Sequence, residues 1–170
     1  LLALPISAFA IEFKAEEKYN SVFVVTSRNS LGSGFAIGEN CIITNAHVVE
    51  NYNHIRLTTY SGKNYSAYLV GCDQEKDIAV LKINNGKGTS VKFGNTPNVE
   101  DAVILISSKT GSNVSANIGI LVSNDKALTT TIPTLKYEEG APLFNSKGEV
   151  VGMNSSKVTN SSLSKAYSNK

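Results

Sequence analysis

Residues 41–49 of this chain read Cys-Ile-Ile-Thr-Asn-Ala-His-Val-Val, and they decide the fold. The β-branched run at their start predicts a strand. The one convincing helical turn of the whole chain, Ala46–Glu50, follows directly and puts His47 at the end of that strand. Thirty residues further on, Asp77 opens another apolar run, Ile78–Ile83. The pattern therefore predicts a β-protein with a histidine and an aspartate at the ends of two strands.

Short strands separated by Gly, Asn, Asp and Ser turns continue on both sides of this stretch. At this spacing they predict an all-β sandwich or barrel and not a parallel α/β sheet. A soft boundary at Asn84–Pro97 divides the chain into residues 11–90 and 91–170. The expected strands are Ser21–Thr26, Ser33–Ile37, Cys41–Asn45, His54–Thr59, Ser66–Val70, Ile78–Ile83, Ala102–Ser107, Ile118–Val122, Ala127–Ile132, Pro142–Phe144 and Val150–Asn154.

Composition narrows the class of partner. The chain has 170 residues, 41% of them hydrophobic and 18% charged, as in an ordinary globular protein. Its formal net charge is only +2, and the basic residues are scattered, so we expect no nucleic-acid partner. No cluster of metal-ligating residues and no cofactor motif is present in the sequence, so we expect neither a metal nor a cofactor.

The first ten residues are apolar and end in Ala8-Phe9-Ala10, the small-x-small pattern of a signal-peptidase site. We interpret residues 1–10 as the remnant of a signal peptide, although a buried N-terminal strand is the alternative. No later apolar run approaches the ~18 residues that a membrane helix needs. The sequence therefore predicts a secreted or periplasmic protein with no membrane contact in its mature form.

Three segments in order resemble the trypsin-like serine peptidases, and in particular their HtrA-related branch. Gly32–Ile37 with the 41–49 stretch resembles that family's histidine-bearing strand and turn, Asp73–Ile83 resembles its aspartate segment, and Gly140–Gly152 resembles the chain that follows its nucleophile. A weaker echo lies at Asn117–Ser123. The resemblance implies two antiparallel β-barrels of the trypsin/chymotrypsin type with an active-site-like cleft between them.

The same resemblance assigns roles to His47 and Asp77. In this fold a buried aspartate orients the imidazole through one ring nitrogen, and the other nitrogen faces the nucleophile. A lone histidine would more simply be a satisfied core residue, but Asp77 in the matching place favours the triad-derived interpretation. His54 matches no motif, and we expect it on the surface.

The nucleophile motif is where the resemblance fails. The family has Gly-x-Ser-Gly-Gly-Pro-Leu, whereas this chain has Tyr137, Glu138, Glu139, Gly140 and Ala141 before Pro-Leu. The resemblance places Glu139 in the position of the serine, Tyr137 in that of an oxyanion-loop glycine, and Ala141 in that of a paired glycine. A carboxylate is a weak nucleophile, and its charge opposes the oxyanion that acyl transfer develops.

Three functions stay open. The first is an inactive peptidase homologue, a pseudoprotease, that binds a peptide or protein partner through the cleft or outer loops. The second is an active serine-type endopeptidase with a rearranged site, for which Thr134 is the hydroxyl nearest the loop on its upstream side and Ser146 would require a shifted alignment. The third is a structural or interaction domain of a larger exported protein. The oligomeric state is not predicted.

Two further expectations concern a side-chain pocket and the two cysteines. The resemblance places a side-chain pocket between about Thr131–Lys136 and Val151–Ser155, including Met153, which would accept a small or apolar side chain. Cys41 and Cys72 lie at opposite ends of their expected strands, and strand residues rise about 3.3 Å each, which exceeds the reach of a disulfide. We expect two separate thiols, with Cys41 buried.

Overall fold

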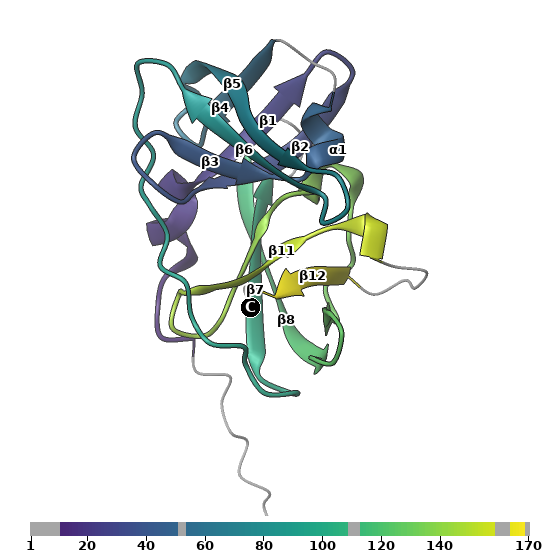
Figure 1. Ribbon diagram of the computed structural model, residues 1–170. Helices are drawn as coiled ribbons and strands as arrows, with labels where there is room; N and C mark the ends of the chain where they lie inside the picture. The colour runs from purple at the N-terminus through teal and green to yellow at the C-terminus, as the bar shows by residue number, and fades with distance from the viewer. Residues whose placement is uncertain (1–10, 51–53, 109–112, 159–163, 169–170) are drawn as a thin grey trace, which may run out of the picture.

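The computed structural model describes residues 11–50, 54–108, 113–158 and 164–168. Six strands form a first closed antiparallel barrel in the order β1-β2-β3-β6-β5-β4, at the top of Figure 1. A single helical turn, α1 (Ala46–Val49), follows β3. The strands are β1 (Val22–Ser27), β2 (Ser30–Ala36), β3 (Cys41–Thr44), β4 (Ile55–Thr59), β5 (Asn64–Asp73) and β6 (Ile78–Ile83).

Alternation along the strands fills this barrel. In β4, Ile55 and Leu57 are buried and the intervening Arg56 is exposed. Residues of the same inward set, including Phe23 and Leu81, form one buried cluster with them. A strand with one face on a core and one in solvent requires this two-residue period, which is why the sequence predicted these strands well.

A second closed barrel follows, in the order β10-β11-β12-β9-β8-β7. Its strands are β7 (Ala102–Ser108), β8 (Val114–Ser123), β9 (Leu128–Thr130), β10 (Pro142–Phe144), β11 (Val150–Asn154) and β12 (Ser164–Ser168). One buried cluster lies inside it, and a second joins the barrels, because Val22 and Phe35 of the first barrel pack there with Ile104 and Phe144 of the second. The expected all-β, two-barrel fold is confirmed.

Some details differ from the sequence-based prediction. Strands β5 and β8 are longer than expected, and β12 lies in the Ser- and Asn-rich end where no strand was predicted. Ile11 and Phe13 pack against the cluster that contains Phe144, and the backbone N–H of Glu12 donates to the carbonyl of Ser146. The N-terminal end of the described chain therefore lies against the second barrel, although residues 11–90 were assigned to the first. The predicted signal-peptide remnant, residues 1–10, lies outside the described residues.

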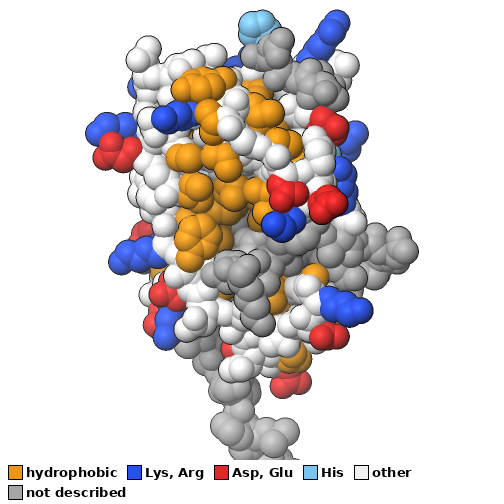
Figure 2. Space-filling model, in the orientation of Figure 1, with side chains coloured by type: hydrophobic (Ala, Val, Ile, Leu, Met, Phe, Trp, Pro, Cys, Tyr) orange, Lys and Arg blue, Asp and Glu red, His pale blue; other side chains and the backbone are white. Residues whose placement is uncertain are grey.

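The first barrel has an apolar surface region, and it carries both cysteines of the chain. Figure 2 shows apolar side chains gathered over the first barrel, with charged groups around them. Both cysteines are free, Cys72 is exposed, and Cys41 is half-buried and not buried as expected. Opposite Cys41 and Cys72 on β6 lie Lys82 and Ala79, so the two thiols are separated along the strand. Among the described residues, no helix is long and apolar enough to cross a membrane.

Candidate active site

His47 lies on α1, directly after β3, and its imidazole contacts the carboxylate of Asp77. Nδ1 is 2.9 Å from Oδ1 and 2.8 Å from Oδ2, and the backbone N–H of His47 donates to Oδ1 at 3.0 Å. One carboxylate thereby orients both the ring and the backbone that carries it. The His47 side chain stays 25% exposed.

Asp77 is fixed from several directions. Its φ is 55°, in the left-handed region that aspartate tolerates better than most residues, and its carbonyl accepts hydrogen bonds from the backbone N–H of Ala46 and the Asn45 amide. Its carboxylate also accepts from Ser155 Oγ at 3.0 Å and lies 3.6 Å from Lys157 Nζ. Burial alone would raise the pKa of Asp77, but hydrogen bonds from His47 and Ser155 and the attraction of His47 outweigh it, so the pKa lies below its ordinary value.

Sequence reasoning missed Ser155 and Lys157 as parts of this site. Both follow β11 in the second barrel, and Ser155 is separated from Asp77 by 78 residues. The available signal was weak: Ser155 ends the segment Val151–Ser155 that was expected to line the cleft. These two contacts show that the Asp77 carboxylate also joins the two barrels.

Glu139 lies on the other side of the imidazole. It follows the 3₁₀ helix η2 (Lys136–Glu138), and its Oε2 is 3.6 Å from His47 Nε2. The side chain is buried, and Oε2 accepts the backbone N–H of Ser156 at 2.9 Å. The Glu139 carbonyl accepts from the backbone N–H of Ser33 at 2.7 Å. The structure therefore brings the three predicted residues, His47, Asp77 and Glu139, into one site.

The loop around Glu139 is closely packed against the first barrel. Gly140 has φ +84°, and a Cβ there would meet the Ser33 carbonyl oxygen at 2.2 Å, so the position requires glycine. Ser33 Oγ donates to the Tyr137 carbonyl at 3.0 Å. Ala141 is fully buried in the core of the second barrel, where its methyl group packs with Leu143.

The carboxylate of Glu138 is hydrogen-bonded to residues of the second barrel and not to His47. Its Oε1 accepts from Ser107 Oγ at 3.0 Å and from Asn117 Nδ2 at 3.2 Å, and its Oε2 accepts the backbone N–H of Leu135 at 3.0 Å. The residue is 1% exposed. Its carboxylate fastens the loop to β7 and β8.

The expected side-chain pocket is only partly found. A hollow of ≈ 270 Å³ lies beside Glu138 and is lined by Thr131, Ile132, Pro133 and Leu135 of the expected wall, together with Asn117 and Ile118 of β8. None of Val151–Ser155 lines it. Met153 is 5% exposed, packs in the cluster between the barrels and does not line this hollow. The long apolar side chain of Met153 is instead buried in that core, in the same cluster as Phe144.

Within the described part of the chain, no three His, Cys, Asp or Glu residues are grouped so that they could bind a metal ion. His47 can accept or donate a proton at Nε2. The group that faces this nitrogen is a buried carboxylate.

A family model described as "Trypsin-like peptidase domain" matches residues 32–153, which is most of the chain and includes His47, Asp77 and Glu139. The chain belongs to the trypsin-like peptidase family. Several bacterial relatives of this family are named "Probable periplasmic serine endoprotease DegP-like". That of Halomonas elongata is 36% identical over 146 residues, covering 79% of this chain and 31% of the relative.

Two further trypsin-like peptidases support the assignment. The Chlamydia trachomatis relative is 31% identical over 143 residues, covering 76% of this chain and 29% of its own length. The crystal structure of the serine endoprotease from Yersinia pestis superimposes with a TM-score of 0.79 at 27% identity, covering 88% of this chain and 59% of that one. The chain spans about a third of the length of the curated relatives it matches.

Proposed function

We propose that this trypsin-like peptidase homologue has no proteolytic activity and acts by binding a peptide or protein partner. One observation carries the proposal: the group that faces His47 Nε2 is the buried carboxylate of Glu139, at 3.6 Å. Glu139 precedes Gly140-Ala141-Pro142-Leu143, and from the resemblance to the family's Gly-x-Ser-Gly-Gly-Pro-Leu motif we assign it to the place of the serine.

The chemistry of acyl transfer explains why this replacement matters. A serine donates its proton to the imidazole and attacks through Oγ, whereas the Glu139 carboxylate offers no such proton, and its negative charge opposes the oxyanion that acyl transfer develops. The carboxylate is also engaged by the Ser156 N–H. Removing the nucleophile of a serine peptidase lowers kcat by about a millionfold.

The partner is proposed to bind through the cleft or the outer loops. The first barrel exposes three consecutive apolar residues of β5: Tyr68, Leu69 and Val70 are 45%, 39% and 51% exposed. Contiguous exposed apolar surface is typical of protein interaction sites. The apolar side chains that Figure 2 shows over this barrel support a protein or peptide partner.

An exported location is part of the proposal. The relatives are named periplasmic, and residues 1–10 have the pattern of a signal-peptide end. Because the chain spans about a third of its relatives, a role as an interaction domain of a larger exported protein is the related alternative. Deleting the leader from an expressed full-length gene and fractionating the cells tests the location.

An active endopeptidase with a rearranged site is the second candidate, since the relatives are named serine endoproteases. It needs another nucleophile at His47 Nε2. The contact described for this nitrogen is with Glu139 Oε2, at 3.6 Å. Thr134, the nearest upstream hydroxyl, instead donates to Asn154 Oδ1 at 3.2 Å, and Ser146 lies beyond β10.

The deciding experiment compares the protein with three variants on unstructured casein and with a fluorophosphonate probe. We expect no cleavage and no labelling of the natural chain, and little recovery in Glu139→Ser alone. The triple variant Tyr137→Gly, Glu139→Ser, Ala141→Gly should gain the most activity, because it restores the whole motif. Labelling of the natural chain that disappears in His47→Ala would overturn the proposal in favour of the active endopeptidase.

A further inference from the structure

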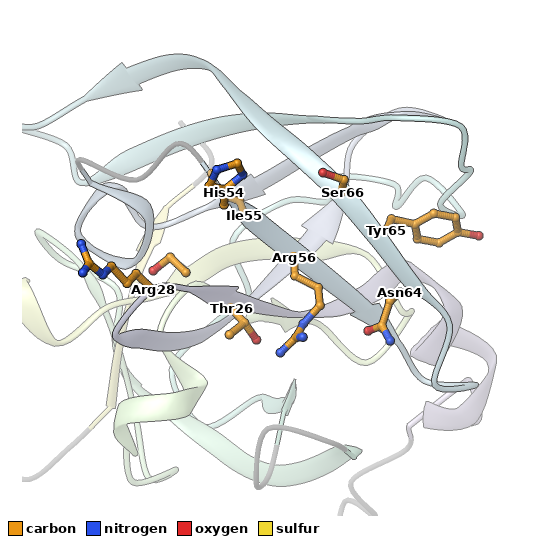
Figure 3. Close-up of a pocket in the computed structure, with 9 residues that line it drawn as sticks. Thr26, Arg28, His54, Ile55, Arg56, Asn64, Tyr65 and Ser66 are labelled. Carbon is orange, nitrogen blue, oxygen red and sulfur yellow. The ribbon is translucent and has the colours of Figure 1, made fainter.

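The outer face of the first barrel has a hollow away from the His47 site. It measures ≈ 500 Å³ and is lined by nine residues of β1, β4, β5 and their ends: Thr26, Ser27, Arg28, His54, Ile55, Arg56, Asn64, Tyr65 and Ser66. None of these residues belongs to the site around His47, Asp77 and Glu139. Figure 3 shows the hollow from outside the barrel.

Strand register explains how its side chains come together. Thr26 pairs with Arg56 across β1 and β4, and Arg56 pairs with Ser66 across β4 and β5. The three side chains therefore form one row on the outer face, while Ile55 and Leu57 point into the core. Along each of these strands, every second side chain lies on the same face of the barrel wall.

The charge of this hollow is unusual for the chain. Of 16 Lys and Arg residues only two are arginines, and both of them, Arg28 and Arg56, line it together with His54. Its lining includes no Asp or Glu. Across the described residues, the ion pairs found involve Lys76, Lys87, Lys157 and His47, and neither guanidinium takes part in one. Two arginines and a histidine gathered without a carboxylate favour an anionic ligand.

The neutral groups of the hollow suit the same kind of ligand. Thr26 and Ser66 carry hydroxyls on either side of Arg56. Asn64 accepts the Thr58 hydroxyl through its Oδ1 at 2.7 Å, which leaves its NH₂ group as the donor. In Figure 3, Arg56 lies between Thr26 and Asn64, with Arg28 and His54 toward one end and Tyr65 at the other. Hydrogen-bond donors thus outnumber acceptors.

We propose that this hollow binds a phosphate or sulfate group, either as the free anion or as an ester. The guanidinium fork matches two oxygens of a tetrahedral oxyanion, and the hydroxyl and amide donors can serve the others. The basic residues elsewhere in the sequence are scattered, which favours a single anionic group over a polyanion. This site is independent of proteolysis and of any partner in the cleft.

The test is an NMR titration of the protein at constant ionic strength adjusted with sodium chloride. Inorganic phosphate, sulfate and phenyl phosphate are added separately, and the amide signals of Thr26, Arg56 and Ser66 are followed. We expect saturable shifts confined to β1, β4 and β5. Tighter binding of phenyl phosphate than of inorganic phosphate identifies an ester as the ligand, and equal or weaker binding identifies the free anion.

Variants separate a built site from general charge attraction. Arg56→Gln should weaken phosphate binding by about tenfold or more, and Arg56→Lys, which keeps the charge and loses the fork, should fall between. Lys126→Gln removes the same charge from the exposed turn between β8 and β9 and should leave binding unchanged. Arg56 is exposed, so its variants should keep the folded amide spectrum. Shifts that do not saturate, or equal weakening in Lys126→Gln, would overturn the proposal.

Discussion

The two nitrogens of His47 face two carboxylates with very different surroundings. On the Nδ1 side, Asp77 is contacted by the His47 ring and backbone, by Ser155 and by Lys157, and its own carbonyl is hydrogen-bonded. On the Nε2 side, Glu139 lies 3.6 Å from the ring, and its Oε2 accepts one backbone N–H, that of Ser156.

This difference shows which of the two carboxylates also stabilises the fold. The Asp77 contacts connect the first barrel to the chain after β11, so losing them would weaken the fold whatever chemistry the site performs. The Glu139 carboxylate, which faces Nε2, makes fewer contacts, so replacing this side chain should lower the stability of the fold less. The His47–Asp77 pair therefore stabilises the fold whether or not the site is catalytic.

The largest expected effect is on the backbone that carries Glu139. Gly140→Ala forces a Cβ toward the Ser33 carbonyl oxygen, at 2.2 Å, from a residue with φ +84°. We expect a loss of about 4 kcal/mol or more in the free energy of unfolding. Urea unfolding measures it.

Gly71→Ala is the matched control for this change. Nothing lies within 4 Å of the Cβ position in Gly71, which is on the exposed part of β5. Its unfolding free energy should change by no more than about 1 kcal/mol. Similar stabilities of the two variants would show that the loop can shift, and that the placement of Glu139 is not fixed by Gly140.

Asp77→Asn tests the other side of the imidazole and should cost roughly 3 kcal/mol at neutral pH, because it removes a buried charged partner. The pKa of Asp77 is lowered in the folded state, so its ionisation stabilises the fold. That contribution is fully present above the unfolded value of about 3.9 and is lost as the pH falls through the folded pKa.

The difference between the natural chain and Asp77→Asn should therefore shrink in urea titrations below about pH 4. Asp125→Asn, in the exposed turn after β8, is the control and should change stability little at any pH. A difference that stays constant down to the lowest accessible pH would contradict the assignment of Asp77 as an ionised, stabilising group.

The adjacent residues Glu138 and Glu139 give a sharper comparison of a structural with a site carboxylate. Glu138→Gln turns an NH₂ group toward one of three donors and should cost about 2–3 kcal/mol. Glu139→Gln can still accept the Ser156 N–H through its amide oxygen and should cost about 1 kcal/mol or less. Equal losses in urea unfolding would mean that Glu139 is as structural as Glu138.

The sequence predicted what depends on local pattern and on the order of motifs. Strands such as Ile78–Ile83 alternate between buried residues and half-buried or exposed ones, and the His47–Asp77 pairing followed from the resemblance to the trypsin-like peptidases. Contacts between distant segments were not predicted from the sequence. Ser155 donates a hydrogen bond to Asp77 from the other barrel, and Arg28 and Arg56 share a hollow only because β1 and β4 pair in one register. Strand β12 escaped because a polar segment has no hydrophobic period and forms a strand through its pairing with β11 and β9.

The smallest effect expected is on the thiol of Cys72, which lies on the Asp77 side. Burial raises its pKa, and the nearby charges of Glu50, Asp73 and Asp77 raise it further. The thiolate is the species that reacts with iodoacetamide, so Cys72 should be alkylated more slowly at pH 8 than an unstructured cysteine peptide. Cys41→Ser provides the background in which only Cys72 reacts.

Within that background, Glu50→Gln should speed the alkylation of Cys72 by up to about twofold, because one of the charges that disfavour the thiolate is gone. Glu39→Gln, whose carboxylate instead pairs with Lys87 on the surface, should leave the rate unchanged. Because neither change touches His47, the rate reports the negative field on the Asp77 side alone. An unchanged rate in Glu50→Gln would mean that solvent screens the Glu50 charge at this thiol.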